Sequence, residues 1–420
     1  MGAKIEVPAG SPFTIHNIPF GVISTQDSPK PRCATAIGDY AIDLAIYAQH
    51  GFLTDSVGPS AVEVLSKPSL NVFSTFDYLV RKAVRDGLIA NITDGKIPED
   101  SLVKLDAVTM HLPFEIGGFS DFYCSMEHVQ NCTPLSKEAS IPINWYYAPS
   151  VYNGRVSSIV PSPQPIRRPR GVSFNPTNGK PSYGPSLGLD YELEMGYFVS
   201  KPVKHGSELD IKNADQHIFG FVLLNDWSSR DLQLFEMPPL GPFNGKGFGT
   251  SVSPWVVTMD ALQPHRCEPK TKQDPPPFDH LKWPTEQDAT FDIKLEVELI
   301  RDGKSHSLAT SNLKYLYWTP FQQITHHASA MCGLNTGDLL GTGTVSGSGV
   351  DSNGKKAELG CLLEATQAGT KDLELLDGTK IKWLNDGDEV ILKAWCGDKK
   401  GEGAWFGFGE CRGKILPALQ

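Results

Sequence analysis

The chain has 420 residues, of which 40% are hydrophobic and 20% charged, and 38 basic against 48 acidic residues give a formal net charge of −10. That acidic balance argues against nucleic acid or an anionic membrane as a partner. The length favours two or three domains with a substantial core, and 40 glycines with 32 prolines favour a β-rich fold with many turns.

Targeting signals and cysteine usage bear on where the protein works. Residues 1–10 lack the apolar core of a signal peptide, and the apolar run at 219–224 is far too short to cross a bilayer. The eight cysteines include no Cys-x-x-Cys pair, which fits reduced thiols in a cytoplasmic protein. Cys124 and Cys132 are expected to be small buried hydrophobic residues. We therefore expect a cytoplasmic protein without a membrane partner.

The first part of the chain, up to about residue 110, is interpreted as one domain. Short strands are predicted at 21–24, 32–38 and 39–44, where turn residues separate apolar runs. A helix is predicted over 71–94, and the spacing of its apolar residues predicts one buried face, made by Tyr78, Leu79, Val80, Ala83 and Val84. This part has no catalytic pattern, so packing, assembly or the covering of a cleft is its expected role.

The most unusual stretch is Leu-Asp-Tyr-Glu-Leu-Glu-Met at 189–195, which alternates acidic and apolar residues. In a strand this alternation would place Asp190, Glu192 and Glu194 on one face, where hard oxygen ligands suit Mg²⁺, Ca²⁺ or Mn²⁺. Residues 291–299 have the same alternation, and there a strand with one solvated face is the simplest interpretation. The pattern alone therefore favours a solvated strand over a metal site.

A second polar cluster follows an apolar strand predicted at 218–224. Asn225-Asp226-Trp227-Ser228-Ser229-Arg230-Asp231 begins where that strand ends, and such positions often carry sites. Asp226 is either a site residue or the cap of the next helix. The glycine-rich segments at 241–247 and 341–347 lack the spacings of phosphate-binding and dinucleotide-binding loops, so nucleotide binding is excluded.

Several motifs in order carry a family resemblance. They are Ser-Asp-Phe-Tyr at 120–123, Asp-Tyr-Glu-Leu-Glu at 190–194, Asn-Asp-Trp-Ser-Ser-Arg-Asp at 225–231, Pro-Leu-Gly-Pro-Phe at 239–243, Lys-Gly-Phe-Gly-Thr at 246–250 and Thr-Val-Ser-Gly at 344–347. Over nearly its full length the chain resembles the fumarylacetoacetase family, metal-dependent hydrolases of a carbon–carbon bond that end tyrosine breakdown. The resemblance implies a β-rich α+β fold, with a small SH3-like barrel at 1–113 and a β-roll catalytic domain at 114–420. It also implies a homodimer.

The resemblance also implies the metal ligands. The residues that match the family's ligands for Ca²⁺ or a similar cation are Asp121, Glu192, Glu194 and Asp226. Asp190 is then a neighbour and not a ligand. Lys246 and Thr250 match positions that complete a second site, of the Mg²⁺ type, beside Asp226. Mn²⁺ is an alternative ion, and no organic cofactor is expected.

The catalytic and substrate-binding residues follow from the same resemblance. His128 matches a general base and Glu364 the carboxylate that orients it, whereas Arg230, Gln233 and Lys246 match donors that hold a developing oxyanion. The substrate is a small molecule. Its expected contacts are Tyr123, Tyr152, Gln233, Met237 and Thr344.

Some positions depart from the family pattern. The family has Asn-Val-Gly followed by Phe-Arg after the histidine, whereas this chain keeps Asn131 and continues with Cys-Thr-Pro-Leu-Ser-Lys at 132–137, so that Lys137 is the one cation available to replace the arginine. Met237 replaces a tyrosine, and Asn153 replaces a histidine. These changes remove hydrogen bonds to a dianionic substrate.

Three functions remain open at this point. The first is hydrolysis of a β-diketo acid such as fumarylacetoacetate, which gives fumarate and acetoacetate. The second is a diverged enzyme that uses the same metal–enolate chemistry for decarboxylation, isomerisation, dehydration or carbon–carbon bond formation on a bulkier, less charged substrate in a biosynthetic pathway. The third is a binding protein without catalysis. The presence of His128, Glu364 and all four metal carboxylates favours an enzyme.

Overall fold

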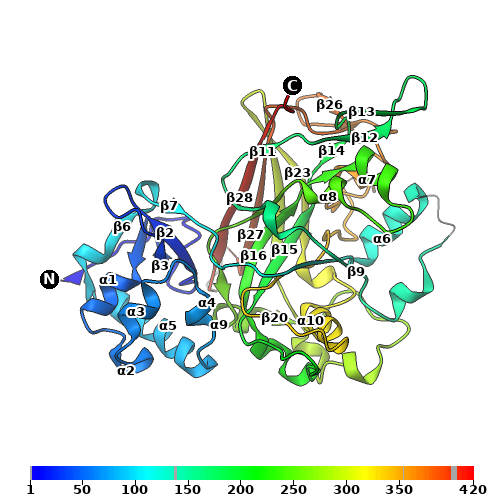
Figure 1. The fold of residues 1–420 in the computed structure, drawn as a ribbon. Coiled ribbons are helices and arrows are strands. Elements are labelled where there is room, and N and C mark those ends of the chain that lie inside the picture. Colours follow the sequence, from blue (N-terminus) through cyan, green and yellow to red (C-terminus); the bar gives the residue numbers. More distant parts are fainter. Residues whose placement is uncertain (1, 137–139, 353, 399–403) are drawn as a thin grey trace.

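The computed structural model describes residues 2–136, 140–352, 354–398 and 404–420. The described chain forms a smaller and a larger lobe that lie side by side, with the N-terminus at the outer end of the smaller lobe (Figure 1). The boundary predicted between residues 113 and 114 falls in the connection between the lobes, and the division into two domains stays a prediction. No helix in the described part of the chain has the length and apolar character needed to span a bilayer.

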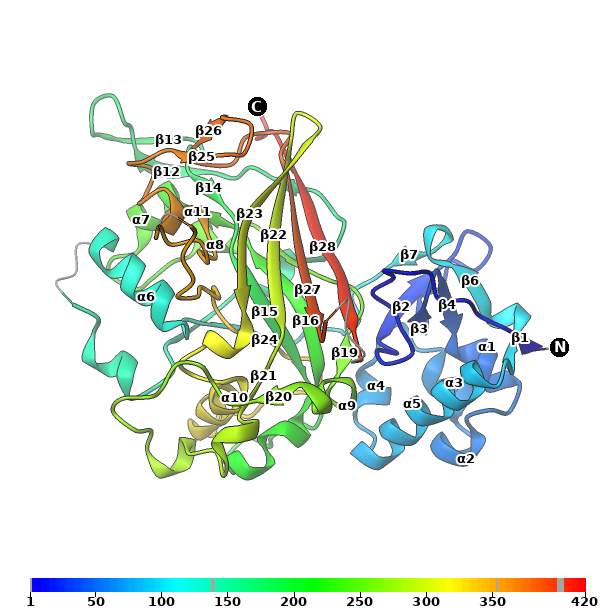
Figure 2. The same cartoon turned by 180° about the vertical axis from the view of Figure 1, so that it is seen from behind.

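The smaller lobe is a five-stranded sheet with helices packed on it (Figure 2). The predicted strands are present, and β3 and β4 are joined through Gly38, whose φ of +57° suits a glycine in a two-residue turn. The sheet order is β6 (Leu102–Lys104), β4 (Tyr40–Asp43), β3 (Arg32–Ile37), β2 (Phe20–Ser24) and β7 (Thr109–Met110). The helices are α1 (Leu44–Gln49), α2 (Thr54–Val57), α3 (Ala61–Leu65), α4 (Asn71–Ser74) and α5 (Tyr78–Thr93), and β1 (Gly2–Ala3) pairs with β5 (Ile97–Pro98).

The helix predicted over 71–94 is divided into α4 and α5, and most of its predicted buried face is wrong. Leu79 is 73% exposed, whereas the buried residues of α5 are Val84, Leu88 and Ile92. Those three residues are spaced four apart, so they form the narrow stripe that faces the lobe's core. The extended backbone of Asp77 separates the two helices.

The larger lobe consists of two curled sheets around one core, so the fold is a mixed one of helices and curled sheets (Figures 1 and 2). The eight-stranded sheet runs β10 (Ile159–Pro161), β18 (Thr250–Val252), β16 (Ile218–Asp226), β15 (Leu193–Val199), β24 (Leu339–Gly341), β8 (Phe119–Phe122) and β9 (Val151–Asn153), with β19 (Val257–Thr258) also on β16. The five-stranded sheet runs β11 (Ile166–Arg167), β28 (Phe406–Leu416), β27 (Glu389–Cys396), β22 (Lys294–Arg301) and β23 (Lys304–Asn312).

Shorter elements complete the larger lobe. The two-stranded pairs are β12 (Arg170–Phe174) with β13 (Pro181–Pro185), β14 (Leu189–Asp190) with β17 (Ser228–Ser229), β20 (Arg266–Cys267) with β21 (Thr290–Phe291), and β25 (Leu373–Glu374) with β26 (Lys380–Ile381). The helices are α6 (Met126–Cys132), α7 (Arg230–Glu236), α8 (Asn244–Gly247), α9 (Met259–Leu262), α10 (Pro320–Ser329) and α11 (Leu362–Ala365).

Strand β16 explains why the predicted apolar strand has no polar face. Phe221 and Leu223 belong to the core of the larger lobe, whereas Phe219 and Val222 pack in a second core that it shares with the smaller lobe. In that second core the ring of Phe219 lies 5.4 Å from the ring of Phe114. A strand between two cores needs apolar residues on both faces, and this one is buried throughout.

Candidate active site

Four carboxylates meet where the central strands of the eight-stranded sheet end. Asp121 lies in β8, Glu194 in β15 and Asp226 at the end of β16, and Glu192 lies between β14 and β15. One oxygen of each carboxylate lies within 4.8 Å of the corresponding oxygens of the other three, and all four residues are buried. The register of the sheet brings them together, because β15 and β24 are neighbours and Gly341 of β24 pairs with Asp121.

The solvated strand favoured by the pattern at 189–195 is wrong, because every residue of that stretch is buried. The comparison stretch behaves as predicted: residues 291–299 alternate between buried apolar and half-buried polar side chains. The difference arises from position. Both faces of β15 are covered, because Met195 and Tyr197 pack in the core of the larger lobe and Phe198 packs in the second core. Its one acidic residue, Glu194, lies among the carboxylates of Asp121, Glu192 and Asp226.

The charges of this cluster are only partly balanced by the protein itself. Lys246 Nζ forms ion pairs with Glu192 and, at 2.9 Å, with Asp226, and the Arg230 guanidinium lies 2.9 Å from Glu192. Among the described residues, Asp121 Oδ1 and Glu194 Oε1 are buried without a hydrogen-bond partner. Burial and the neighbouring carboxylates raise the pKa of Asp121 and of Glu194 well above the usual range. Two unpartnered buried oxygens in a set of four carboxylates fit a hard divalent cation.

A glycine that the sequence did not single out makes room for these carboxylates. A Cβ atom added at Gly341 would lie 2.6 Å from Asp121 Oδ1 and 3.1 Å from Glu194 Oε2. The backbone N–H of Gly343 donates to Glu194 Oε2 at 3.0 Å. The segment 341–347 therefore contributes to the carboxylate cluster through its backbone, which explains its glycine content without a nucleotide.

Asp226 is also surrounded by donors on its own side of the cluster. Thr250 Oγ1 donates to its Oδ1 at 2.8 Å, and Tyr152 OH and Lys246 Nζ donate to its Oδ2 at 2.7 and 2.9 Å. The alternative role of Asp226 as a helix cap is wrong, because the N-cap of α7 is Ser229. The structure thus brings Lys246 and Thr250 to Asp226.

Asp190 is a neighbour of the cluster and holds another part of the site. Its carboxylate accepts hydrogen bonds from the backbone N–H of Leu362 at 2.7 Å and of Leu363 at 2.9 Å, and from Arg230 Nε at 2.8 Å. The Asp190 carboxylate is therefore hydrogen-bonded to the first turn of α11, the helix that carries Glu364. These hydrogen bonds connect the acidic segment 189–195 to the carboxylate that contacts His128.

His128 and Glu364 form a buried acid–base pair. His128 Nδ1 lies 2.7 Å from Glu364 Oε2, and Glu364 also accepts hydrogen bonds from Asn131 at 2.7 Å and Ser346 at 2.8 Å. Burial alone would lower the pKa of His128, but the neighbouring Cys132 and Glu364 raise it well above its ordinary value of 6.5. Burial raises the pKa of Glu364 and His128 lowers it, with a net decrease. The pair can hold an imidazole in one orientation with Nε2 free to exchange a proton.

One cavity of about 460 Å³ joins the acid–base pair to the carboxylate cluster. The predicted residues in its wall are Asp121, Tyr123, His128, Tyr152, Glu192, Arg230, Gln233, Met237, Lys246 and Thr344. The remaining predicted residues lie behind this wall: Glu194, Asp226 and Glu364 contact members of it, and Thr250 contacts Asp226. Apolar side chains that the sequence did not single out, including Val129, Trp145 and Leu234, also line the cavity.

Of the positions that depart from the family pattern, one lines this cavity and one does not. Met237 is 42% exposed and lines the cavity. Asn153, in β9, lies outside the wall of this cavity as the described residues define it, and it lines a separate pocket of about 500 Å³ that also includes Tyr152 and Lys246. The prediction for Lys137 lies outside the described residues.

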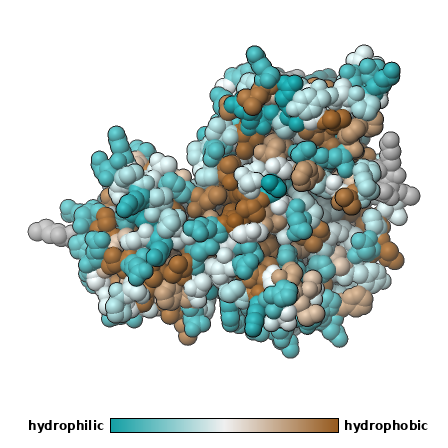
Figure 3. Space-filling model, viewed as in Figure 1, coloured by the Kyte–Doolittle hydropathy of each residue, from teal (hydrophilic) through white to brown (hydrophobic). Residues whose placement is uncertain are grey.

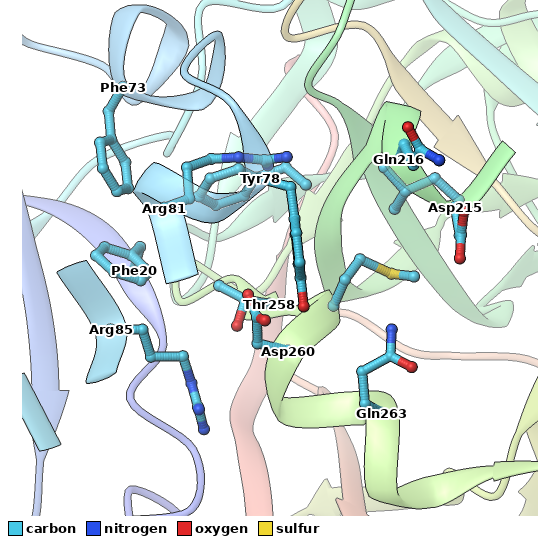
Figure 4. A pocket seen from close by; sticks show the side chains of 13 residues that line it. Phe20, Phe73, Tyr78, Arg81, Arg85, Asp215, Gln216, Thr258, Asp260 and Gln263 are labelled. Carbon is cyan, nitrogen blue, oxygen red and sulfur yellow. The ribbon is translucent and has the colours of Figure 1, made fainter. Parts of the chain in front are cut away.

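A cavity of about 580 Å³ between the two lobes has a different character (Figure 4). Its wall contains Arg81 and Arg85 of α5 and Asp260 of α9, toward which Tyr78 points. The Arg81 guanidinium lies 5.5 Å from the Phe219 ring, and Arg85 donates to the backbone oxygen of His16 at 2.6 Å. These contacts attach α5 to its neighbours. None of the predicted site residues lines this cavity.

Comparisons with known proteins show what this chain is similar to. A family model described as "Fumarylacetoacetase N-terminal" matches residues 16–113, and "Fumarylacetoacetate (FAA) hydrolase C-terminal" matches residues 118–416. The chain is 43% identical over 428 residues to fumarylacetoacetase from Homo sapiens, with 99% of each chain covered. It is 42% identical over 432 residues to fumarylacetoacetase from Oryza sativa, covering 99% of this chain and 97% of that one.

A solved structure shows the same fold. A fumarylacetoacetate hydrolase from psychrophilic Exiguobacterium antarcticum superposes with a TM-score of 0.52 at 16% identity, covering 95% of this chain and 99% of that one.

Proposed function

The chain belongs to the fumarylacetoacetate hydrolase family, and from that premise we propose that it hydrolyses a carbon–carbon bond of fumarylacetoacetate, giving fumarate and acetoacetate. The observation that carries the proposal is one cavity whose wall includes both His128 and two carboxylates of the cluster, those of Asp121 and Glu192. A β-diketone has two oxygens for a cation and a carbonyl carbon for attack by water, and this cavity offers groups for both. The other enolate reactions are not favoured, because these full-length relatives are all named fumarylacetoacetase.

Asp121, Glu192, Glu194 and Asp226 are the proposed ligands of the metal ion. A divalent cation bound there supplies Lewis acidity, which polarises a substrate carbonyl and stabilises the enolate that leaves. Oxygen ligands favour Ca²⁺ or Mg²⁺, with Mn²⁺ as an alternative. Lys246 and Thr250 hold Asp226 from the other side and so complete the surroundings of the second, Mg²⁺-type site.

His128 is the proposed general base. Because its Nδ1–H donates to Glu364, the lone pair of Nε2 is available for a proton from water, and the water oxygen then attacks the carbonyl carbon. Glu364 positions the ring and stabilises the imidazolium that forms. Asn131 and Ser346, which donate to Glu364, keep its carboxylate in place.

Arg230, Gln233 and Lys246 are the proposed donors to the developing oxyanion. Arg230 is fixed by Asp190 and Glu192 and donates to Gln233 at 3.0 Å, so its orientation is set before substrate binds. Donors that are fixed in this way contribute about 3 kcal/mol each in comparable sites.

The remaining wall residues are proposed to bind the substrate. Thr344 Oγ1 is buried without a hydrogen-bond partner among the described residues, so it can donate to a substrate oxygen. Tyr123 lies at the same wall, with its ring centroid 5.2 Å from that of His128. Tyr152 also lies in the wall, and its hydroxyl donates to Asp226, so that it positions this proposed ligand as well. Met237 gives the rim an apolar contact in place of a hydroxyl.

Several finer expectations join the proposal. We propose that the five-stranded sheet of the smaller lobe is an SH3-like barrel, that the larger lobe is a β-roll, and that the enzyme works in the cytoplasm in tyrosine breakdown. Figure 3 shows hydrophobic residues gathered near the middle of one face, beside the junction of the lobes. Exposed apolar areas mark interaction surfaces, which supports a homodimer.

Isotope labelling tests the proposed reaction. In heavy-oxygen water, hydrolysis puts one solvent oxygen into the fumarate carboxylate and none into acetoacetate, because water attacks the carbonyl carbon that becomes fumarate. In deuterated water, the departing enolate takes deuterium into acetoacetate. Mass spectrometry of both products reads the labels. Products without solvent oxygen, or release of carbon dioxide without fumarate, would refute the proposal.

A further inference from the structure

A second group of metal-binding side chains lies behind the cavity wall. It consists of His128, Cys361 and Glu364, which are all buried and whose donor atoms lie within 4.8 Å of one another. Cys361 is the N-cap residue of α11 and Glu364 lies in the first turn of that helix, whereas His128 comes from α6. In the described part of the chain, this group and the carboxylate cluster are the two places where three or more such donors meet.

The distances within this group are close to those of a tetrahedral zinc site. Cys361 Sγ lies 3.2 Å from Glu364 Oε2, and His128 Nδ1 lies 2.7 Å from the same oxygen. Nitrogen, oxygen and sulfur donors around one Zn²⁺ ion lie about 3.3–3.8 Å apart. Opening these two contacts by less than about 1 Å therefore makes room for the ion.

The chemistry of the donors separates this group from the carboxylate cluster. Thiolate and imidazole favour Zn²⁺, whereas Ca²⁺, Mg²⁺ and Mn²⁺ favour sites made of oxygen. One Zn²⁺ ion with the Cys361 thiolate, the Glu364 carboxylate and a neutral imidazole has no net charge, which suits a buried site. Cys132 lines the cavity with its Sγ 3.7 Å from His128 Nδ1, so a thiol or a water molecule from the cavity can take the fourth position.

A contact between a thiol and a histidine is not sufficient for such a site. Cys332 Sγ lies 3.6 Å from His327 Nδ1, but this exposed cysteine belongs to no group of three donors among the described residues. Cys124 and Cys132 are buried, as expected, and neither is one of the three donors behind the wall. The distinguishing feature is the convergence of a thiol, an imidazole and a carboxylate, and Cys332 offers a natural control.

We propose that His128, Cys361 and Glu364 bind a Zn²⁺ ion that inhibits the enzyme. Zinc takes the place of the proton on His128 Nδ1, that proton moves to Nε2, and the thiol proton of Cys361 passes to solvent. The lone pair of Nε2 is then lost to the reaction. The cavity provides a route for the ion, because His128 and Leu363 both line it. Inhibition rests on the proposed function of His128 as the base, whereas binding depends only on the three donors.

Co²⁺ tests the binding without any need for turnover. It adopts the tetrahedral geometry of zinc sites, and a cobalt–thiolate bond gives an intense charge-transfer absorbance that oxygen ligands do not give. The full chain is titrated in excess Ca²⁺ and Mg²⁺, so that the carboxylate cluster is occupied. We expect a single equivalent of Co²⁺ to give this absorbance and added Zn²⁺ to remove it.

Variants assign the absorbance to this site. Cys361→Ser should lose it, because a hydroxyl does not ionise as a thiol does, whereas Cys332→Ser should keep it. Glu364→Gln should weaken Co²⁺ binding about tenfold or more, and it replaces Cys361→Ser if that variant is not folded by circular dichroism. No thiolate absorbance in the original chain, or the same absorbance in Cys361→Ser and Glu364→Gln, would overturn the proposal.

Inhibition is measured separately, with each protein compared with its own rate in the absence of zinc. Zn²⁺ should stop fumarylacetoacetate hydrolysis by the original chain, and Cys361→Ser should need about tenfold more Zn²⁺ or more for the same loss. Full hydrolysis with the site occupied would overturn the inhibitory role. No hydrolysis by zinc-free protein that gives the cobalt–thiolate absorbance would refute the proposed function and still support the zinc site.

Discussion

At the scale of single residues, the site depends on pairs whose members change one another's chemistry. The carboxylate of Glu364 lies 2.7 Å from His128 Nδ1, and with Cys132 it outweighs the effect of burial on the histidine. A base must be neutral to accept a proton, so activity should fall as the pH drops through the pKa of His128. Because that pKa is raised, the acid limb of kcat/KM should lie above pH 6.5.

Replacement of Glu364 by glutamine tests this coupling. Burial lowers the pKa of His128 and the carboxylate of Glu364 raises it. When the carboxylate is removed, the pKa of His128 should fall, and the acid limb of kcat/KM should move to lower pH. Turnover on the plateau should drop about a hundredfold, because the ring and its imidazolium lose their support. The measurement is kcat/KM against pH for both proteins. An acid limb that stays in place in the variant would show that Glu364 does not set the pKa.

Gly341 makes a second prediction at this scale. In Gly341→Ala the new methyl group would lie 2.6 Å from Asp121 Oδ1, so the carboxylates must move apart. Affinity for Ca²⁺ or Mg²⁺, measured by titration calorimetry, should weaken about tenfold or more. Gly184→Ala is the matched control, because a Cβ atom there meets no described atom within 4 Å. Equal affinity in both variants would mean that the cluster does not hold the cation.

At the scale of elements, β16 carries both the site and the junction of the lobes. Its last residue is Asp226, and Phe219 near its start packs against Phe20 and Phe73 of the smaller lobe and against Phe114 of the connection between the lobes. Phe219→Ala should lower the free energy of unfolding by about 3–5 kcal/mol, because it leaves a cavity in the shared core.

Denaturant unfolding measures this loss. Phe174→Ala, at a residue that is 60% exposed, should change stability by less than about 1 kcal/mol. A Phe219→Ala protein as stable as the Phe174→Ala protein would show that the smaller lobe contributes little to the shared core.

The sequence predicted some elements well and others poorly, for physical reasons. Strands β2, β3 and β4 were predictable because turn residues separate them. The burial of 189–195 was not, because alternation reports a strand's two faces but not what covers them. The role of Asp226 was ambiguous for the same reason, since its partners Tyr152, Lys246 and Thr250 are distant in the chain.

The site residues were predictable through the family motifs and not through local pattern. His128 and Glu364 are far apart in the sequence, and no periodicity indicates their contact. Gly341 was missed because its role arises from the pairing of β24 with β8. The contact of Cys132 with His128 lies within α6, one helical turn apart, and it was missed because no helix was predicted there.

At the scale of the whole molecule, the cation should stabilise the fold. The four buried carboxylates form ion pairs with only two cationic side chains of the described residues, Arg230 and Lys246. A bound divalent ion would therefore reduce the electrostatic repulsion among the carboxylates in the folded protein. At a hundredfold excess over its Kd, the ion should add about 2.7 kcal/mol to the free energy of unfolding. Removal by a chelator should therefore lower Tm.

Thermal unfolding with and without chelator measures this effect. Glu194→Gln, which removes one carboxylate charge, should lose most of the difference in Tm between the two conditions. An unchanged Tm after metal removal from the original protein would contradict the assignment of the cluster as a metal site.

The most direct test follows the loss of fumarylacetoacetate enol absorbance. Protein freed of metal is compared with the same protein after Ca²⁺, Mg²⁺ or Mn²⁺ is restored, and His128→Ala is measured beside it with its metal content verified. We predict rapid loss only when metal and His128 are both present. Loss that is independent of metal, or an equal rate in His128→Ala, would contradict the account of one cavity in which a histidine base and a metal ion act on the same substrate.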